Sequence, residues 1–367
     1  MLAGFAVALC AGNALALRDC EINGQHVNPD NGSTYAGKTG IMKCRDRDSG
    51  KLVLEEEYRD GRAIGYRKMV DFQGNTVIGN YNERGNRDGE AKRYDADGVL
   101  VAEERYIDGS TAGVQTAYHK NKQIRRRSFD EPRKGTLASL EYNERGQMSE
   151  LRCADKPLLG DDRVLCGFDG KISDVTLYNG KGDIIAKARY ENGKRLATEV
   201  FAKPGVVARS EEVQGERRVT RQNFAEGPLR LETVTVGDRR ESEQEYARSG
   251  QPVRETRWQD GRTSEEKLWY LNGQPRRTTR WEHDGSRVLA KSDEFWDSGK
   301  LRARTVRDER RGYVGLQQAF NEDGTPESES LYENGVLVSR KGYKNGRLVL
   351  EEEYFEDGSR KSVRKAE

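Results

Sequence analysis

The chain has 367 residues, of which 34% are hydrophobic and 34% are charged, and its formal net charge is +2. This charged fraction exceeds the roughly 25% of ordinary globular domains and leaves too little apolar area for several thick cores. Acidic and basic residues are interleaved, which excludes the basic surface that nucleic-acid binding needs. Aromatic residues recur at regular intervals, a pattern that argues against disorder and favours a thin, repetitive sheet.

Residues 1–16 are predicted to be an export signal. The stretch is uncharged and mostly apolar, is shorter than the ~20 residues of a membrane span, and ends in the small-x-small sequence Ala14–Ala16. No Lys or Arg precedes it, so the true translation start stays open. Acylation of Cys10 is the alternative, which the bulky Leu9 before it disfavours. We expect a periplasmic or secreted protein with no transmembrane segment.

Removal of this signal leaves four cysteines, Cys20, Cys44, Cys153 and Cys166. An even count in an exported chain implies disulfides, and four cysteines allow three connectivities. The pairs Cys20–Cys44 and Cys153–Cys166 close the shortest loops and are favoured, each stabilising the fold by about 3 kcal/mol. The spacing indicates neither a redox CxxC motif nor a zinc site.

A short unit recurs through most of the chain: an alternating strand, an aromatic residue, two or three polar residues and a glycine. The segments Leu52–Tyr58 and Leu348–Tyr354 carry the same seven residues. Asn-Gly and Asp-Gly pairs, which favour two-residue hairpin turns because these need positive φ, separate the strands. These pairs are Asp60-Gly61, Asp97-Gly98, Asp108-Gly109, Asn192-Gly193, Asp260-Gly261, Asn272-Gly273, Asn334-Gly335 and Asn345-Gly346. The clearest aromatic anchors of the repeat are Tyr58, Tyr94, Tyr106, Tyr190, Tyr332, Tyr343 and Tyr354.

The pattern predicts an all-β protein: an elongated, twisted antiparallel meander of repeated hairpins that forms one solenoid-like sheet. Alternation places aromatic and small apolar side chains on one face and mixed charges on the other. The predicted segments, in chain order, are a disulfide-containing N-terminal cap at 17–50, repeats at 51–150, a disulfide-stapled loop at 151–167, repeats at 168–362 and a tail at 363–367.

The units resemble the MORN repeat, specifically its bacterial variant. Tyr94–Gly109 (YDADGVLVAEERYIDG) and Leu331–Gly358 carry the resemblance most clearly. The usual second glycine is present after Gly61, as Gly65, but many units lack it. The resemblance implies a hairpin-repeat architecture and a binding or scaffold role, and many bacterial proteins with this repeat are described as antitoxin-like. The tyrosine–aspartate repeat of large secreted toxin shells is the second resemblance, and most units lack its Asp after the Tyr.

No catalytic constellation is recognised. The sequence has no GxSxG, HExxH or P-loop motif and only three histidines, so we predict no catalytic residues, no metal site and no cofactor. Trp258, Trp269, Trp281 and Trp296 gather in one segment. They are interpreted mainly as sheet core, with one or two of them exposed enough to bind a sugar or peptide.

These observations predict a non-enzymatic exported repeat protein that acts as a protein-binding scaffold of the bacterial cell envelope. The alternatives are a cell-wall carbohydrate-binding module and an antitoxin-like partner that neutralises a toxin. A protein partner is expected, a glycan is the second choice, and nucleic acid is excluded. Unpaired sheet edges recruit strands, so self-association through these edges is also expected.

Overall fold

The computed structural model describes residues 18–365, and the predicted export signal at 1–16 lies outside the described residues. The chain folds into antiparallel β-strands, with one short α-helix, α1 (Asp162–Leu165), and one short 3-10 helix, η1 (Gly32–Thr34). The predicted all-β meander is confirmed. It forms two sheets, of 13 and 18 strands, where the sequence predicted one. Between residues 18 and 365, no helix has the length and apolarity needed to cross a membrane.

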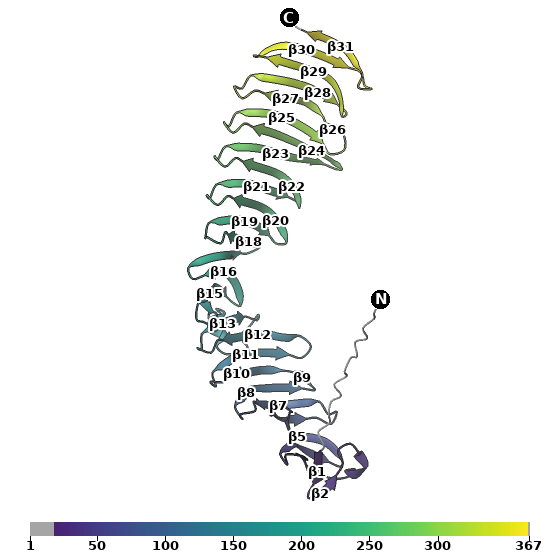
Figure 1. The fold of residues 1–367 in the computed structure, drawn as a ribbon, viewed down its shortest axis with the longest axis vertical. Helices are drawn as coiled ribbons and strands as arrows, with labels where there is room; N and C mark the ends of the chain where they lie inside the picture. The colour runs from purple at the N-terminus through teal and green to yellow at the C-terminus, as the bar shows by residue number, and fades with distance from the viewer. Residues whose placement is uncertain (1–17, 366–367) are drawn as a thin grey trace, which may run out of the picture. The chain divides into compact units, whose positions relative to one another are not determined.

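From β3 to β13 the strands of the first sheet follow one another along the chain as in Figure 1, with β9 paired to β8 beside the main path, and at the other end β1 lies between β3 and β2. They are β1 (Arg18–Ile22), β2 (Gln25–Val27), β3 (Gly40–Asp46), β4 (Leu52–Arg59), β5 (Arg62–Val70), β6 (Thr76–Tyr81), β7 (Arg87–Tyr94), β8 (Leu100–Ile107), β9 (Ser110–Thr111), β10 (Gly113–Tyr118), β11 (Ile124–Glu131), β12 (Gly135–Tyr142) and β13 (Met148–Arg152).

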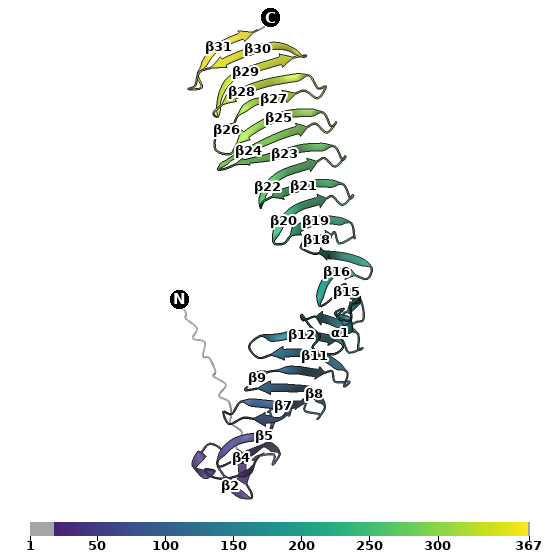
Figure 2. The same ribbon diagram turned by 180° about the vertical axis from the view of Figure 1, so that it is seen from behind.

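The second sheet keeps strict sequence order, as Figure 2 shows from behind. Its strands are β14 (Ser173–Tyr178), β15 (Ile184–Glu191), β16 (Lys194–Lys203), β17 (Val206–Gln214), β18 (Arg217–Asn223), β19 (Leu229–Val236), β20 (Arg239–Tyr246), β21 (Pro252–Gln259), β22 (Arg262–Trp269), β23 (Pro275–Asp284), β24 (Arg287–Phe295), β25 (Leu301–Asp308), β26 (Gly312–Tyr313), β27 (Gly315–Phe320), β28 (Pro326–Glu333), β29 (Val336–Lys344), β30 (Arg347–Tyr354) and β31 (Arg360–Lys365).

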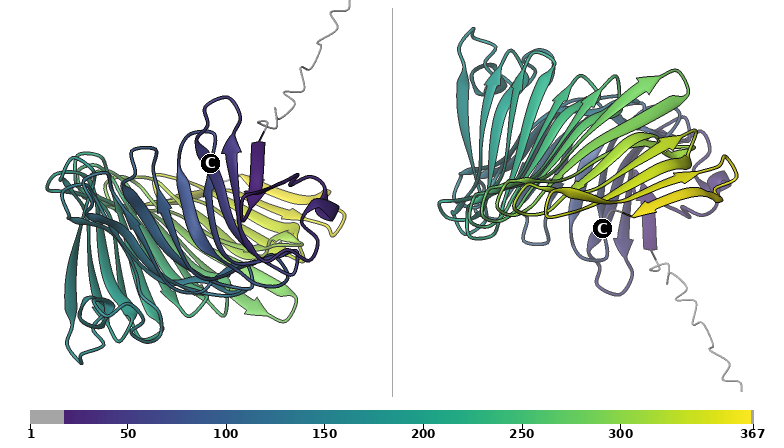
Figure 3. Two further views of the ribbon diagram at one scale, coloured as in Figure 1. Left: turned by 90° about the horizontal axis from the view of Figure 1, so that it is seen from below. Right: turned by 90° about the horizontal axis from the view of Figure 1, so that it is seen from above.

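The chain divides into two compact units. One ends at Ile184 and includes Tyr190–Lys194, and the other consists of Ile185–Arg189 and the chain from Arg195 onward. Within each sheet, the substantial contacts join strands that are neighbours in the sheet order. Successive strands turn progressively against one another, as the views along each sheet in Figure 3 show, and this is the twist that strand sterics impose.

Two kinds of turn connect the strands: two-residue turns with positive φ at both residues, and longer turns in which only the glycine has positive φ. Six of the eight predicted Asx-Gly pairs adopt positive φ at both residues, as Asp60 (49°) and Gly61 (73°) do. The predictions for Asp97-Gly98 and Asn272-Gly273 were wrong, since only the glycine of each pair has positive φ. In the turn containing Asp97, the Asp95 carboxylate accepts the backbone N–H groups of Asp97 and Val99 at 3.0 and 2.9 Å. This local competition selects a longer turn.

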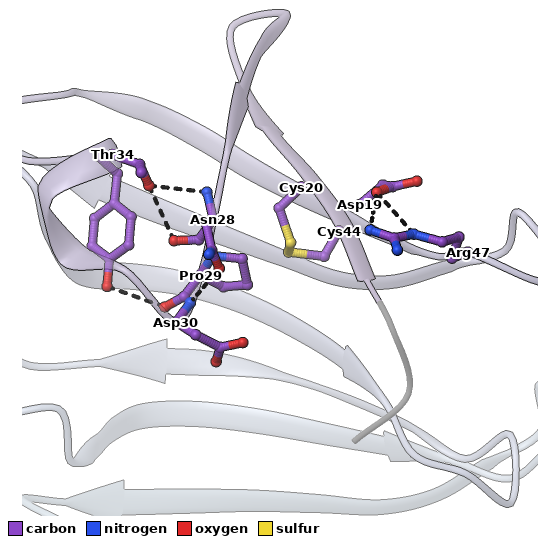
Figure 4. The surroundings of a disulfide bond; sticks show 9 residues. Asp19, Cys20, Asn28, Pro29, Asp30, Thr34, Cys44 and Arg47 are labelled. Atoms are coloured by element: carbon purple, nitrogen blue, oxygen red, sulfur yellow. Dashed lines mark hydrogen bonds and ion pairs between the residues drawn. A yellow bond between two sulfur atoms is a disulfide. The ribbon is translucent and has the colours of Figure 1, made fainter. Parts of the chain in front are cut away.

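One cluster of buried side chains joins the N-terminal cap to the first repeat. Cys20, Ile22, Val27, Met42, Cys44 and Tyr58 form it. The Cys20–Cys44 disulfide joins directly opposed residues of β1 and β3, and Figure 4 shows it with its polar surroundings. Beside it, Thr34 Oγ1 accepts from the Asn28 N–H at 2.9 Å and donates to the Asn28 carbonyl at 3.0 Å, which closes the loop that precedes β3.

The second disulfide, Cys153–Cys166, lies in the segment between β13 and β14. The fully buried carboxylate of Asp162 accepts the N–H groups of Leu158 and Leu159 at 2.7 and 3.0 Å. Gly193 donates its N–H to the Cys166 carbonyl at 2.8 Å. This segment is therefore held by its own hydrogen bonds and by a bond from the turn between β15 and β16.

The aromatic face of the sheet also contains buried charge. Along β4, the alternate positions Glu56 and Tyr58 lie on the same face, and both side chains are buried. Arg67, opposite Glu56 on β5, pairs with its carboxylate. A charge can be buried beside an aromatic ring because the neighbouring strand supplies the opposite charge.

Candidate binding surfaces

The aromatic anchors of the repeat occupy graded environments. Tyr58 and Tyr190 are buried, at 8% and 6% exposure. The other anchors are half-buried, and they are Tyr94, Tyr106, Tyr332, Tyr343 and Tyr354. Where their hydroxyls reach a glutamate, they donate to it, as Tyr106 donates to Glu104 at 2.9 Å. These rings therefore position the strands and also present part of their surface to solvent.

Charged side chains form ladders across neighbouring strands. In the second sheet, Lys267 lies between Glu255 and Glu265, with N–O distances of 4.0 and 3.0 Å, and Arg280 continues the ladder from Glu265 at 3.0 Å. Ammonium and guanidinium donors hold the pKa of Glu265 below its usual value, against the opposing effect of burial. Most of these side chains are part-exposed, so each pair adds less than about 1 kcal/mol to stability.

A similar polar group spans the first sheet. The Tyr118 hydroxyl donates to Glu103 at 2.7 Å, and Lys92 pairs with the same carboxylate at 3.0 Å. These two donors lower the pKa of Glu103. Burial and the hydrogen bond to Glu103 raise the pKa of Tyr118 to about 12. The phenol is therefore a fixed neutral donor at physiological pH.

The four tryptophans do not form one row. Trp258 and Trp281 precede the turns that end β21 and β23, whereas Trp269 and Trp296 lie at the turns that follow β22 and β24. Consecutive turns of a meander lie at opposite ends of the strands, so the four rings are divided between the two sides of the sheet that the turns form. All four are half-buried. Trp281 borders a cavity of about 310 Å³ with Val288, Ala290 and Arg307.

Arginines recur along one of the two sides that the turns form in the second sheet, and they lie in β-bulges next to these turns. Pairing between strands skips Arg230, Arg276 and Arg302, and each is the third residue after a turn glycine. An extra residue in a bulge re-aims its side chain relative to the regular alternation. Arg276 lies over the Tyr270 ring at 6.0 Å, and Arg302 lies over the Trp296 ring at 4.7 Å.

The rings under these arginines are fixed by the next hairpin. The Tyr270 hydroxyl donates to the Phe295 carbonyl at 2.9 Å, and Trp296 Nε1 donates to the Phe320 carbonyl at 3.2 Å. A cavity of about 110 Å³ lies between the two hairpins. Its lining includes Tyr270, Arg276, Arg277, Glu294, Phe295 and Arg302. The sheet therefore holds two stacked guanidinium groups at a preformed depression.

Sequence reasoning did not identify these arginines. Turn glycines followed three residues later by Arg were visible in the sequence, as Gly227 with Arg230, Gly273 with Arg276 and Gly299 with Arg302. Their meaning depended on the bulge register, which the sequence pattern alone does not specify.

The structure places the four remaining cysteines in two disulfides, and residues 18–365 contain no group of His, Cys, Asp and Glu side chains able to hold a metal ion.

Comparison with known proteins places the repeat in a family. The family described as MORN repeat variant matches residues 87–108 and 313–334. Each match begins beside a turn and ends at the next Asx-Gly hairpin, at Asp108 and Asn334. No curated protein matches the chain.

Two crystal structures, titled TcdB2-TccC3-Cdc42 and TcdB2-TccC3-TEV, are similar at 11% and 12% identity, with TM-scores of 0.17 and 0.18. Each alignment covers 95% of this chain and 20% of the matched chain, so this protein spans about a fifth of the length of those relatives. The unit of aromatic residue, turn and glycine is built here as antiparallel hairpins, and two copies of it, at 87–108 and 313–334, match the MORN repeat variant.

Proposed function

We propose that this chain is a non-enzymatic, exported scaffold that binds a protein partner in the bacterial cell envelope. The observation that carries the proposal is that, within each sheet, neighbouring hairpins stack and no second layer formed by residues 18–365 covers them (Figures 1 and 2). Half-buried aromatics and charge ladders therefore face solvent on a repetitive surface. Open repeat arrays of this kind supply extended binding surfaces.

The two disulfides support an oxidising compartment, because such bonds persist in secreted and periplasmic proteins and are rare in the cytosol. Export by residues 1–16 is part of the proposal. The ion-paired charges also support a binding role without catalysis. Within each ladder, opposite charges neutralise one another, and these side chains do not point toward a common site where a substrate could react.

The test is crosslinking in the native cell envelope, with a tag on the C-terminus and mass spectrometry of the captured material. The control is the same tagged chain without residues 2–16, which keeps the protein inside the cell if they are the signal. We expect one dominant envelope protein, captured only with the full chain. Recovery of no specific protein would overturn the scaffold function, and equal export of both chains would overturn the signal.

Binding of a cell-wall glycan is the second candidate, favoured by the cavity beside Trp281. An aromatic ring at a depression can stack on a sugar. The division of the four tryptophans between two edges weighs against it, because no continuous aromatic platform results. Co-sedimentation with purified peptidoglycan, compared for the unmodified protein and Trp281→Ala, tests this candidate. Equal sedimentation of both proteins, or of neither, would exclude it.

A further inference from the structure

The cavity at the arginine-bearing edge of the second sheet has an excess of positive charge. Among the residues that the structure describes, neither Arg276 nor Arg302 forms an ion pair, although both line the cavity. Arg277, beside them, is paired with Glu266 at 3.1 Å. Glu294 is the one acidic residue of the lining, so guanidinium groups outnumber carboxylates there.

These two guanidiniums are preorganised. Each lies over a ring whose polar atom is hydrogen-bonded to the next hairpin, so the ring fixes the face on which the arginine rests. A planar guanidinium presents donors in a rigid fork that matches a carboxylate, and stacking leaves these donors free. Little side-chain entropy is then left to lose on binding, which favours recognition.

The surroundings select a single carboxylate over a continuous polyanion. At the corresponding bulge position in the hairpins on either side, the chain has Val253 and Glu327 in place of arginine. Arg276 and Arg302 lie two strands apart, which is roughly 10 Å at ~4.8 Å per strand. The positive patch therefore covers two hairpins and ends at the uncharged Val253 on one side and at the acidic Glu327 on the other, so a nucleic acid or sulfated polysaccharide would find no further arginine in this row and would be repelled at Glu327. An isolated acidic side chain would not.

We propose that the cavity between Arg276 and Arg302 binds a carboxylate side chain of an extended acidic segment in a protein partner. This inference rests on the proposed scaffold function and names the chemistry of one contact. The carboxylate lies between the two guanidiniums and accepts hydrogen bonds from both.

The first experiment uses the full chain and a dye-labelled peptide with two glutamates separated by glycines, acetylated and amidated at its ends, titrated by fluorescence anisotropy at low salt. We expect saturable binding that is lost when both glutamates are replaced by glutamine. Binding should weaken by about tenfold or more in Arg276→Gln/Arg302→Gln, because charge-assisted hydrogen bonds are lost.

The matched control is Arg248→Gln. Arg248 is also stacked on a turn aromatic, Phe224 at 5.5 Å, but it is ion-paired with Glu226 at 3.2 Å. Its replacement should leave peptide binding within about twofold. All three substitutions are at exposed side chains, and unchanged circular dichroism melting excludes unfolding as the cause.

Three results would overturn the inference: no binding of the glutamate peptide, equal binding by the double variant, or tighter binding of a sulfated oligosaccharide or oligothymidylate than of the peptide. The envelope crosslinking separates this failure from failure of the scaffold function. If the unmodified chain captures a partner and the double variant captures it equally, only the carboxylate site is excluded. If the unmodified chain captures none, the scaffold function itself fails.

Discussion

At the scale of single residues, the hydrogen bond from Tyr118 to Glu103 makes a testable contribution to stability. Because the pKa of Tyr118 is raised, its contribution is present below about pH 10, the usual value, and is lost as pH rises through about 12. The pKa of Glu103 is lowered, so its contribution is present above about pH 4.3 and is lost as pH falls through the folded value. Removing the phenol hydroxyl should therefore matter at neutral pH and less in acid.

We expect Tyr118→Phe to lower the free energy of unfolding by about 1 kcal/mol at pH 7. The loss should shrink as pH falls through the lowered pKa of Glu103, because the charge-assisted part of the bond disappears when Glu103 is protonated. Urea denaturation at pH 7 and over a series of acidic pH values measures it. Tyr94→Phe is the control, since no hydrogen bond joins the Tyr94 hydroxyl to another described residue. A loss independent of pH, or as large in Tyr94→Phe, would assign the effect to packing.

At the scale of elements, the turn between β4 and β5 is predicted to stabilise the N-terminal cap, against which it packs. Gly61 has φ of 73°, and a Cβ added there would lie 2.8 Å from the backbone nitrogen of Gly37 and 3.0 Å from the Tyr35 carbonyl oxygen. Its N–H donates to the Lys38 carbonyl at 2.8 Å. Gly98 has a similar φ of 78°, but an added Cβ meets no atom within 4 Å.

Gly98→Ala should therefore lower stability by about 1–2 kcal/mol, the cost of positive φ for a side chain. Gly61→Ala should cost at least about 1 kcal/mol more, because the cap backbone must also move. Chemical denaturation followed by tyrosine fluorescence compares the two. Equal losses would mean that the cap does not depend on close packing against this turn.

The sequence predicted those elements whose signal is local, and it missed those that depend on pairing between strands. The Asp60-Gly61 pair fixes a two-residue turn by backbone preference alone, and alternation then defines the adjoining strands. At Asp97-Gly98 the same dipeptide failed, because Asp95 two residues earlier competes for the backbone donors. The bulges that aim Arg276 and Arg302 depend on pairing between strands, so sequence spacing marked the positions without revealing the cavity.

At the scale of the whole molecule, the division into two sheets was the feature least accessible to sequence. The stapled segment between β13 and β14 was recognisable from Cys153, Cys166 and Pro157, but it was interpreted as a loop inside one array. Its internal packing depends on the buried Asp162 carboxylate, and no periodic pattern signals such a contact.

Self-association through the unpaired edge strands stays a prediction. At β31 the basic residues Arg364 and Lys365 oppose it, because a second copy would bring like charges together, whereas Arg360 and Lys361 are ion-paired with Glu352 and Glu353.

Nearest-neighbour packing within each sheet predicts that damage stays local. Replacing Cys20 and Cys44 together by alanine should destabilise the cap by about 3 kcal/mol on the chain-entropy account. Hydrogen exchange should then accelerate in β1–β5 and remain unchanged in β17–β31, as expected for units that open separately. The matched variant, with Cys153 and Cys166 replaced by alanine, should instead accelerate exchange around β13–β15. If the cap variant lost protection throughout both sheets, the chain would have to unfold as a single cooperative unit, and the one-dimensional account of its stability would be wrong.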